Sequence, residues 1–251
     1  MKKLFAFLIP CLLLSGCAAP ALGGAEIPVE ILGGLDEATR RELVEEPKYV
    51  ALTFDDGHRA STTSRLLDGL LERGVSATFF VIGQQIPGNE ELLRRMAAEG
   101  HQIGNHTYSH VKLLKSEKDV VVQEIQKTEV LLRGAVGEGS FWLRPPYGYI
   151  GAERAALVKT PMVYWTVDPR DWELLDAGKV ACAVTGCVQP GDVILLHDFY
   201  PTSVDAALQI VDQLQGEGYT FVTVEELFRI QGVTPQAGVL YASPCRVRNL
   251  E

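Results

Sequence analysis

The sequence has little cysteine and little basic charge for its length. Five Cys in 251 residues are far too few for a disulfide scaffold. Lys and Arg total 23 against 32 Asp and Glu, and the resulting net charge of -9 lacks the basic footprint of a nucleic-acid binder. A hydrophobic share of 47% is nevertheless that of an ordinary globular protein, and this length fits one or two domains. We therefore expect a folded acidic protein with no nucleic-acid partner.

The first residues resemble an export signal. Met1-Lys2-Lys3 is a basic start, and the apolar run from Leu4 to Leu14 is about half of the ~20 residues needed to span a bilayer. Leu14-Ser15-Gly16-Cys17 resembles a bacterial lipobox, in which the Cys is acylated and becomes the first residue of the mature protein. We predict a signal peptide over 1–16 and a lipid on Cys17. The protein would then be exported and anchored to the outer face of the cytoplasmic membrane, or to an outer membrane. The alternative is an ordinary cleaved signal or a short anchor, with no role for Cys17.

Three cysteines remain beyond this segment. Because three is odd, at most one intramolecular disulfide can form among Cys182, Cys187 and Cys245. If 180–187 is helical, Cys182 and Cys187 point to different faces and pair poorly. No other ligand-type residue sits at a spacing that would make these thiols a metal site.

From Tyr49 onward, short apolar runs alternate with helical patterns. Residues 17–47 are predicted to be a tether with one helix over 35–45, and residues 233–251 a loosely ordered tail. The predicted strands are 49–54, 77–82, 102–103, 141–143, 162–167, 192–196 and 220–224. The predicted helices are 61–73, 89–99, 116–133 with Ser116 as N-cap, 152–159, 176–187, 203–216 and 225–230.

This alternation predicts right-handed βα units and a parallel sheet. About seven units favour a distorted (β/α) barrel smaller than the common eight-unit design. A doubly wound open sheet is the alternative. In both folds the functional site is built where the strands end.

Polar motifs follow five of the predicted strands. They are Asp55-Asp56-Gly57-His58, Asn105-His106-Thr107-Tyr108-Ser109-His110, Arg144-Pro145-Pro146-Tyr147-Gly148, Asp168-Pro169-Arg170-Asp171-Trp172 and His197-Asp198. His106 and His110 are four residues apart and can face one point, and two His with a carboxylate form a catalytic divalent-metal site. Each motif alone also has a structural interpretation: a turn at Asp55-Asp56, solvated loop His, a rigid Pro-Pro turn, or a core His.

Together and in this order, the motifs resemble the polysaccharide deacetylase family, the NodB homology domain of carbohydrate esterase family 4. The resemblance covers residues 48–230, with 231–251 left as a C-terminal tail. It implies a distorted (β/α) barrel that removes N-acetyl groups from amino sugars with the help of a bound metal. One divalent ion is expected, Zn²⁺ first, with Co²⁺, Ni²⁺ or Mn²⁺ as alternatives.

The resemblance also implies roles for single residues. The implied metal ligands are Asp56, His106 and His110. The implied catalytic residues are Asp55 as base, His197 as general acid, Arg144 orienting the base, Asp171 tuning the acid, and Tyr147 offering a backbone N–H to the oxyanion. Trp172 and Leu195 would wall the acetyl methyl group. His58 departs from the family, where proline is common at that position.

The alternatives concern both the activity and the substrate. The presence of both Asp55 and His197 argues against a non-catalytic carbohydrate-binding lipoprotein on the same fold. Surface tethering favours N-acetylglucosamine in peptidoglycan as substrate, with chitooligosaccharide, poly-N-acetylglucosamine or acetylxylan as alternatives. We expect a monomer, and a structural role for His101.

Overall fold

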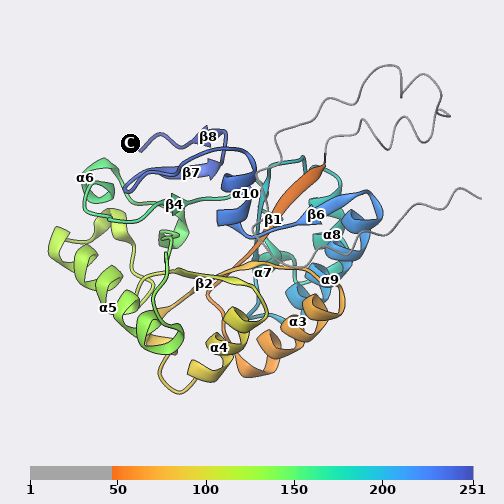
Figure 1. Ribbon diagram of the computed structural model, residues 1–251, viewed down its shortest axis with the longest axis horizontal. Coiled ribbons are helices and arrows are strands. Elements are labelled where there is room, and N and C mark those ends of the chain that lie inside the picture. Colours follow the sequence, from red (N-terminus) through yellow and green to blue (C-terminus); the bar gives the residue numbers. More distant parts are fainter. Residues whose placement is uncertain (1–46, 251) are drawn as a thin grey trace, which may run out of the picture. The chain divides into compact units, whose positions relative to one another are not determined.

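The computed structural model describes residues 47–250 of the chain (Figure 1). The predicted signal peptide, Cys17 and the helix over 35–45 lie outside the described residues. Among the described helices, none is both long enough and apolar enough to cross a bilayer.

A parallel sheet forms the centre of the domain. Its strands β1 (Lys48–Asp55), β2 (Thr78–Val81), β3 (Gln102–Asn105) and β5 (Val193–His197) run in the order β3-β2-β1-β5, and β6 (Tyr219–Phe221) pairs with the first residues of β1. The apolar run of β1 is buried from Val50 onward, as a parallel strand covered on both faces should be. The predicted parallel α/β fold is confirmed.

Isolated bridges close this sheet into a ring. Asn105 of β3 pairs with Leu143, Leu143 pairs with Met162 of β4 (Met162–Val163), and Val167 pairs with Ile194 of β5. The segments predicted as strands over 141–143 and 162–167 therefore contribute only Leu143 and, from the second segment, Met162 and Val167 to this ring. Pro145 and Pro146 cannot donate to a ladder, which stops pairing directly after Leu143. The barrel is distorted because this side is held by single bridges.

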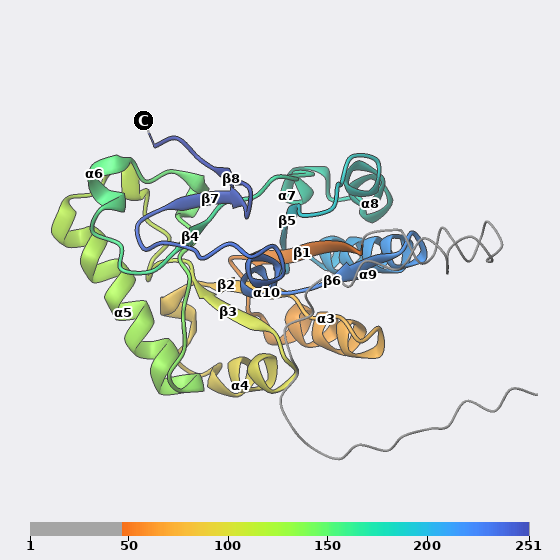
Figure 2. The same ribbon diagram turned by 45° about the horizontal axis from the view of Figure 1, so that its top comes forward.

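Helices pack against the barrel (Figures 1 and 2). They are α3 (Ala60–Glu72), α4 (Glu90–Ala98), α5 (Lys118–Val136), α6 (Ala152–Ala155), α7 (Asp171–Leu174), α8 (Ala177–Thr185), α9 (Pro201–Gly216) and α10 (Val224–Ile230). Leucines of α3 and aliphatic residues of α9 share one buried core with the sheet. Two predicted details are wrong: α5 begins after Glu117 with no side-chain cap from Ser116, and α6 ends at Ala155 instead of Lys159.

The segment predicted as a loosely ordered tail is instead part of the fold. Strand β7 (Leu240–Ser243) pairs in parallel with β4, and β8 (Arg246–Val247) pairs antiparallel with β7. Leu240 and Tyr241 are buried. Both views place β7 and β8 beside β4 (Figures 1 and 2). The three cysteines of the described residues, Cys182, Cys187 and Cys245, are exposed free thiols.

Candidate active site

The five polar motifs meet around one cavity at the carboxyl ends of the strands. The cavity has a volume of about 510 Å³. Its lining includes eight of the residues predicted from the sequence: Asp55, Asp56, His106, His110, Tyr147, Trp172, Leu195 and His197. The other two, Arg144 and Asp171, are buried behind this lining and hydrogen bond to residues in it. The structure therefore brings together every residue of the predicted site that lies within 47–250.

Asp56, His106 and His110 form a possible metal centre. Their ligand atoms all lie within 4.8 Å of one another. Asp56 Oδ1 is 3.4 Å from His106 Nε2 and 3.3 Å from His110 Nε2, and this buried oxygen has no hydrogen-bond partner among the described residues. His106 Nδ1 lies 2.7 Å from the Arg144 carbonyl oxygen, which leaves Nε2 available as a ligand. One unpartnered carboxylate oxygen facing two imidazole nitrogens fits a divalent cation.

The metal-centre residues sit on strained turns. Asp56, Thr107 and His110 have φ values of 65°, 65° and 58°, in the left-handed region that is costly for residues other than glycine. Side chains hold the second of these turns in place: the Thr107 amide donates to Asn105 Oδ1 at 2.8 Å, and the His110 amide donates to Thr107 Oγ1 at 3.1 Å. The turn thus brings two histidines four residues apart to one point without a helix.

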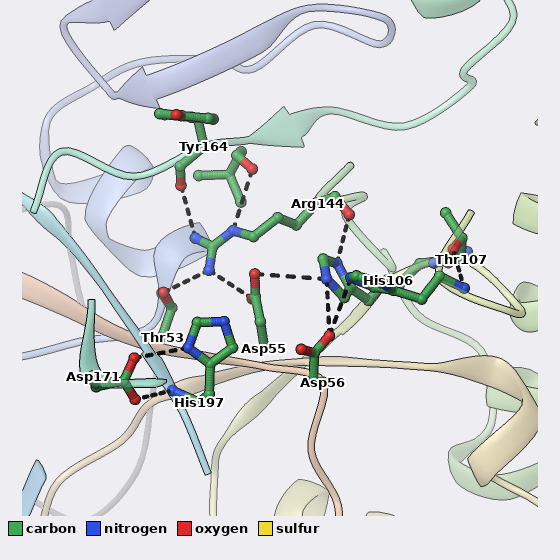
Figure 3. A network of polar contacts seen from close by, with 12 residues as sticks. Thr53, Asp55, Asp56, His106, Thr107, Arg144, Tyr164, Asp171 and His197 are labelled. Atoms are coloured by element: carbon green, nitrogen blue, oxygen red, sulfur yellow. Dashed lines mark hydrogen bonds and ion pairs between the residues drawn. The ribbon is translucent and has the colours of Figure 1, made fainter. Parts of the chain in front are cut away.

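Asp55, the predicted base, is held by a buried arginine (Figure 3). Arg144 Nη1 donates to Asp55 Oδ1 at 2.9 Å and to Thr53 Oγ1 at 2.7 Å, and Nη2 donates to the Tyr164 carbonyl oxygen at 2.7 Å. Burial lowers the pKa of Arg144, and the negative charge of Asp55 counteracts this shift. Arg144 stays charged, as guanidinium groups do in proteins. Arg144 therefore fixes one oxygen of Asp55, while Oδ2 lies 3.7 Å from His106 Nε2 on the metal side.

His197, the predicted acid, is paired with Asp171. Its Nδ1 lies 2.8 Å from Asp171 Oδ1, and its backbone amide donates to Asp171 Oδ2 at 2.8 Å. Burial disfavours the charged imidazole, but the hydrogen bond and charge of Asp171, together with the charges of Asp55 and Asp56, raise the pKa of His197 to about 9. His197 therefore carries a proton at neutral pH.

The Pro-Pro-Tyr-Gly turn forms another part of the cavity wall. Tyr147 has φ 60°, and its ring lies 4.7 Å from the ring of His110, centroid to centroid. Unlike Pro145 and Pro146, Tyr147 has a backbone N–H to offer. Gly148 follows with φ 74°, and a Cβ there would lie 2.1 Å from the ring of Tyr164. Only glycine fits at position 148, because the turn packs directly against the ring of Tyr164. This close packing holds the turn in place.

Several residues of the site were not predicted from the sequence. Tyr149, Trp165 and Tyr200 line the cavity, and Asp168, quoted only within its motif, lines it as well. Trp165 stacks on Tyr164 with ring centroids 3.8 Å apart. Tyr149 and Tyr200 lie between the predicted elements, Trp165 lies within the predicted strand 162–167, and no spacing in the sequence singles out any of the three as a site residue.

Asp198 supports the turn that carries the first two carboxylates. It is fully buried and accepts a hydrogen bond from Thr63 Oγ1. A Cβ on Gly57 would lie 1.5 Å from Asp198 Oδ1, so this carboxyl group packs directly on the glycine after Asp56. Burial raises the pKa of Asp198 to about 7.

The two remaining histidines have structural contacts. His58 is buried, with its ring nitrogens 2.6 Å and 2.9 Å from the carbonyl oxygens of Gly57 and Gln85. His101 Nδ1 accepts from the Ala77 amide at 3.0 Å, and burial lowers the pKa of His101 to about 4. His101 therefore has the structural role predicted for it.

A closed parallel barrel with a possible metal centre, a clamped carboxylate and a charged His–Asp pair has the composition of a metallohydrolase site. Residues 43–164 match the family model for polysaccharide deacetylase. A peptidoglycan-N-acetylglucosamine deacetylase of Bacillus cereus is 40% identical over 187 residues, which are 72% of this chain and 68% of that protein. The chain belongs to the polysaccharide deacetylase family.

Two further relatives extend the comparison. Peptidoglycan-N-acetylglucosamine deacetylase PgdA of Listeria monocytogenes is 36% identical over 181 residues, 72% of this chain but 39% of PgdA, so the chain spans about two fifths of that protein. The structure of a family 4 acetyl xylan esterase from Clostridium thermocellum, in complex with a cobalt ion, superposes with a TM-score of 0.75 at 34% identity. That match covers 78% of this chain and 98% of the esterase.

Proposed function

We propose that residues 48–230 form a metal-dependent hydrolase that removes N-acetyl groups from N-acetylglucosamine residues of a cell-envelope polysaccharide, foremost peptidoglycan. The observation that carries the proposal is the grouping of three elements around one cavity: the Asp56–His106–His110 centre, the Arg144-held Asp55 and the Asp171-held His197. The names of the Bacillus cereus and Listeria relatives support peptidoglycan as the substrate.

The metal ligands would be Asp56 Oδ1, His106 Nε2 and His110 Nε2. Three protein ligands with room left for water and substrate are typical of catalytic zinc, and we propose Zn²⁺, with Co²⁺, Ni²⁺ or Mn²⁺ as alternatives. When bound, such an ion lowers the pKa of water toward ~7 and polarises a carbonyl group.

The side chains then divide the proton transfers. Asp55 Oδ2 takes the proton of the attacking water, while Arg144 holds Oδ1 and keeps the carboxylate oriented. As the new C–O bond forms, the acetyl carbonyl oxygen becomes negative, and the Tyr147 N–H would donate to it; one such donor contributes about 3 kcal/mol. His197 gives its proton to the sugar nitrogen as the C–N bond breaks. The products are acetate and a free amino sugar.

Two apolar side chains of the cavity would receive the acetyl methyl group. Leu195 of β5 is 3% exposed, whereas Trp172 of α7 is 45% exposed. Leu195 can thus form the floor and Trp172 a wall next to solvent. We also propose a monomer, because a single chain supplies all of these residues.

A panel of polymers tests the substrate. Acetate release is measured from peptidoglycan, chitooligosaccharides, poly-N-acetylglucosamine and acetylxylan at equal acetyl concentration. We expect peptidoglycan to give the highest kcat/KM, by about tenfold. Acetylxylan is the second candidate, because the Clostridium structure is that of an acetyl xylan esterase. A higher rate on acetylxylan would contradict the peptidoglycan proposal, and no release from any polymer would contradict hydrolase activity.

We propose further that Cys17 carries a lipid that anchors the protein outside the cytoplasmic membrane. Support comes from Leu14-Ser15-Gly16-Cys17 directly after the apolar run. Mass spectrometry of the mature N-terminal peptide should find residue 17 diacylated or triacylated. An unmodified Cys17 in the mature protein would contradict this proposal.

A further inference from the structure

A groove continues from the active-site cavity toward the C-terminal segment. A second hollow of about 280 Å³ adjoins the first and shares Tyr147 and Tyr149 with it. A third, of about 470 Å³, shares Tyr149 and Leu114 with the second and reaches β7 and the residues after β8. We call the second and third hollows together the basic groove.

The charged side chains that line the basic groove are all cationic. Lys112 and Lys115 line the second hollow and Arg248 lines the third. Within residues 47–250, none of these three side chains forms an ion pair with a carboxylate. Neither hollow has an acidic residue in its lining, whereas the active-site cavity is lined by Asp55, Asp56 and Asp168 in addition to its histidines. A protein with a net charge of -9 thus lines these two adjoining hollows with two lysines and one arginine, Arg248, whose guanidinium lies 3.7 Å from the centre of the Tyr164 ring.

Exposed aromatic rings lie beside these cations. Tyr147 and Tyr149 are 49% and 58% exposed at the junction of the first two hollows. Lys112 Nζ lies 4.9 Å from the centre of the Tyr147 ring. Tyrosine rings pack well against the apolar faces of sugar rings, and their hydroxyls stay in water. An aromatic platform with adjoining cations therefore suits a sugar unit that carries a negative charge.

We propose that the basic groove binds the sugar unit next to the one that is deacetylated, and that this unit carries a carboxylate. The inference rests on the proposed function, because the active-site cavity then holds the N-acetylglucosamine residue. The neighbouring sugar ring lies on Tyr147 and Tyr149, and its carboxylate pairs with Lys112 or Lys115. Arg248, supplied by the C-terminal segment, extends this preference to a carboxylate farther along the glycan or on a substituent. A neutral polymer leaves the cations unpaired.

Two glycans that differ in one group test the proposal. One is a peptide-free tetrasaccharide in which N-acetylglucosamine alternates with a lactyl-bearing sugar, and the other is the same tetrasaccharide with each carboxylate reduced to an alcohol. Binding is measured by calorimetry on the metal-loaded Asp55→Asn protein, and kcat/KM on the unmodified protein. We expect the carboxylated glycan to bind about fivefold tighter at low salt, with the preference shrinking as ionic strength rises.

Substitutions in the basic groove test which residues cause the preference for the carboxylated glycan. Lys112→Gln combined with Lys115→Gln should bring the ratio of the two dissociation constants close to one, and in turnover should act mainly through KM. Lys159→Gln is the matched control: this exposed lysine does not line the groove, and the ratio should stay as in the unmodified chain.

The proposal is overturned if the two glycans bind equally to the starting protein, or if the double variant weakens binding of both by the same factor. Because binding is measured without turnover, a protein that binds the carboxylated glycan selectively but releases no acetate would contradict the proposed function and not the groove.

Discussion

Asp55→Asn should lower kcat for acetate release by about 10³-fold while the protein still binds its metal. An asparagine keeps the size of the side chain and can still accept the hydrogen bond from Arg144 Nη1, which is 2.9 Å from Asp55 Oδ1. It cannot take a proton from water. Asp55 is also absent from the Asp56–His106–His110 centre, so the ligand set is unchanged.

Two further measurements separate a lost base from a damaged fold. Metal affinity by calorimetry should stay within about threefold. The thermal midpoint should fall, because buried Arg144 loses its counter-charge, but the protein should stay folded since Arg144 keeps its bonds to Thr53 and the Tyr164 carbonyl. Asp119→Asn makes the same chemical change at an exposed position on α5 and should leave kcat unchanged. An Asp55→Asn protein with unmodified kcat, or one that has lost its metal, would refute the role assigned to Asp55.

Asp171→Asn should lower kcat at pH 7.5 by about 100-fold and shift the alkaline limb of the pH profile to lower pH. A general acid works in its protonated form, so activity declines as pH rises through its pKa. Burial opposes protonation of His197. The hydrogen bond and charge of Asp171 are the main factors that overcome this effect and raise the pKa of His197 to about 9. Without the Asp171 charge, only the more distant charges of Asp55 and Asp56 oppose the effect of burial, so the pKa of His197 falls well below 9.

The full pH dependence of kcat is the measurement that checks this prediction. The unmodified protein should lose activity near pH 9, and the variant should do so at a clearly lower pH, with slower turnover at every pH because the imidazole is less firmly oriented. Glu173→Gln is a suitable control, since Glu173 is exposed and pairs with Arg170 instead of His197. An alkaline limb that does not move would show that His197 is not the acid, or that Asp171 does not set its pKa.

The sequence predicted the position of the site better than its detail. Parallel strands end at one edge, so motifs that follow strands must meet there, and Asp55, His106 and His197 do. Local chemistry alone suggested only a metal held by two His and a carboxylate. The resemblance to the family added the roles of Arg144 and Asp171, whose partners lie 89 and 26 residues away along the chain.

Other features had no local signal. Strand β7 is four residues long and pairs with two residues of β4, so the apolar run at Leu240 was too short to distinguish from a tail. Tyr149 is positioned by the turn that precedes it. Asp198 is positioned by its contact with Gly57, which joins segments about 140 residues apart. Such contacts depend on how the barrel closes, which no periodicity reveals.

Metal titration tests the central claim most directly. The full chain is stripped of metal with a chelator, and Zn²⁺ is added back in steps while acetate release from an N-acetylglucosamine polymer is followed. We expect no release without metal and full recovery at one equivalent, and no recovery for Asp56→Ala at that concentration, because the centre is built on Asp56 Oδ1. Full activity in the stripped protein, or recovery of Asp56→Ala at one equivalent, would contradict the account.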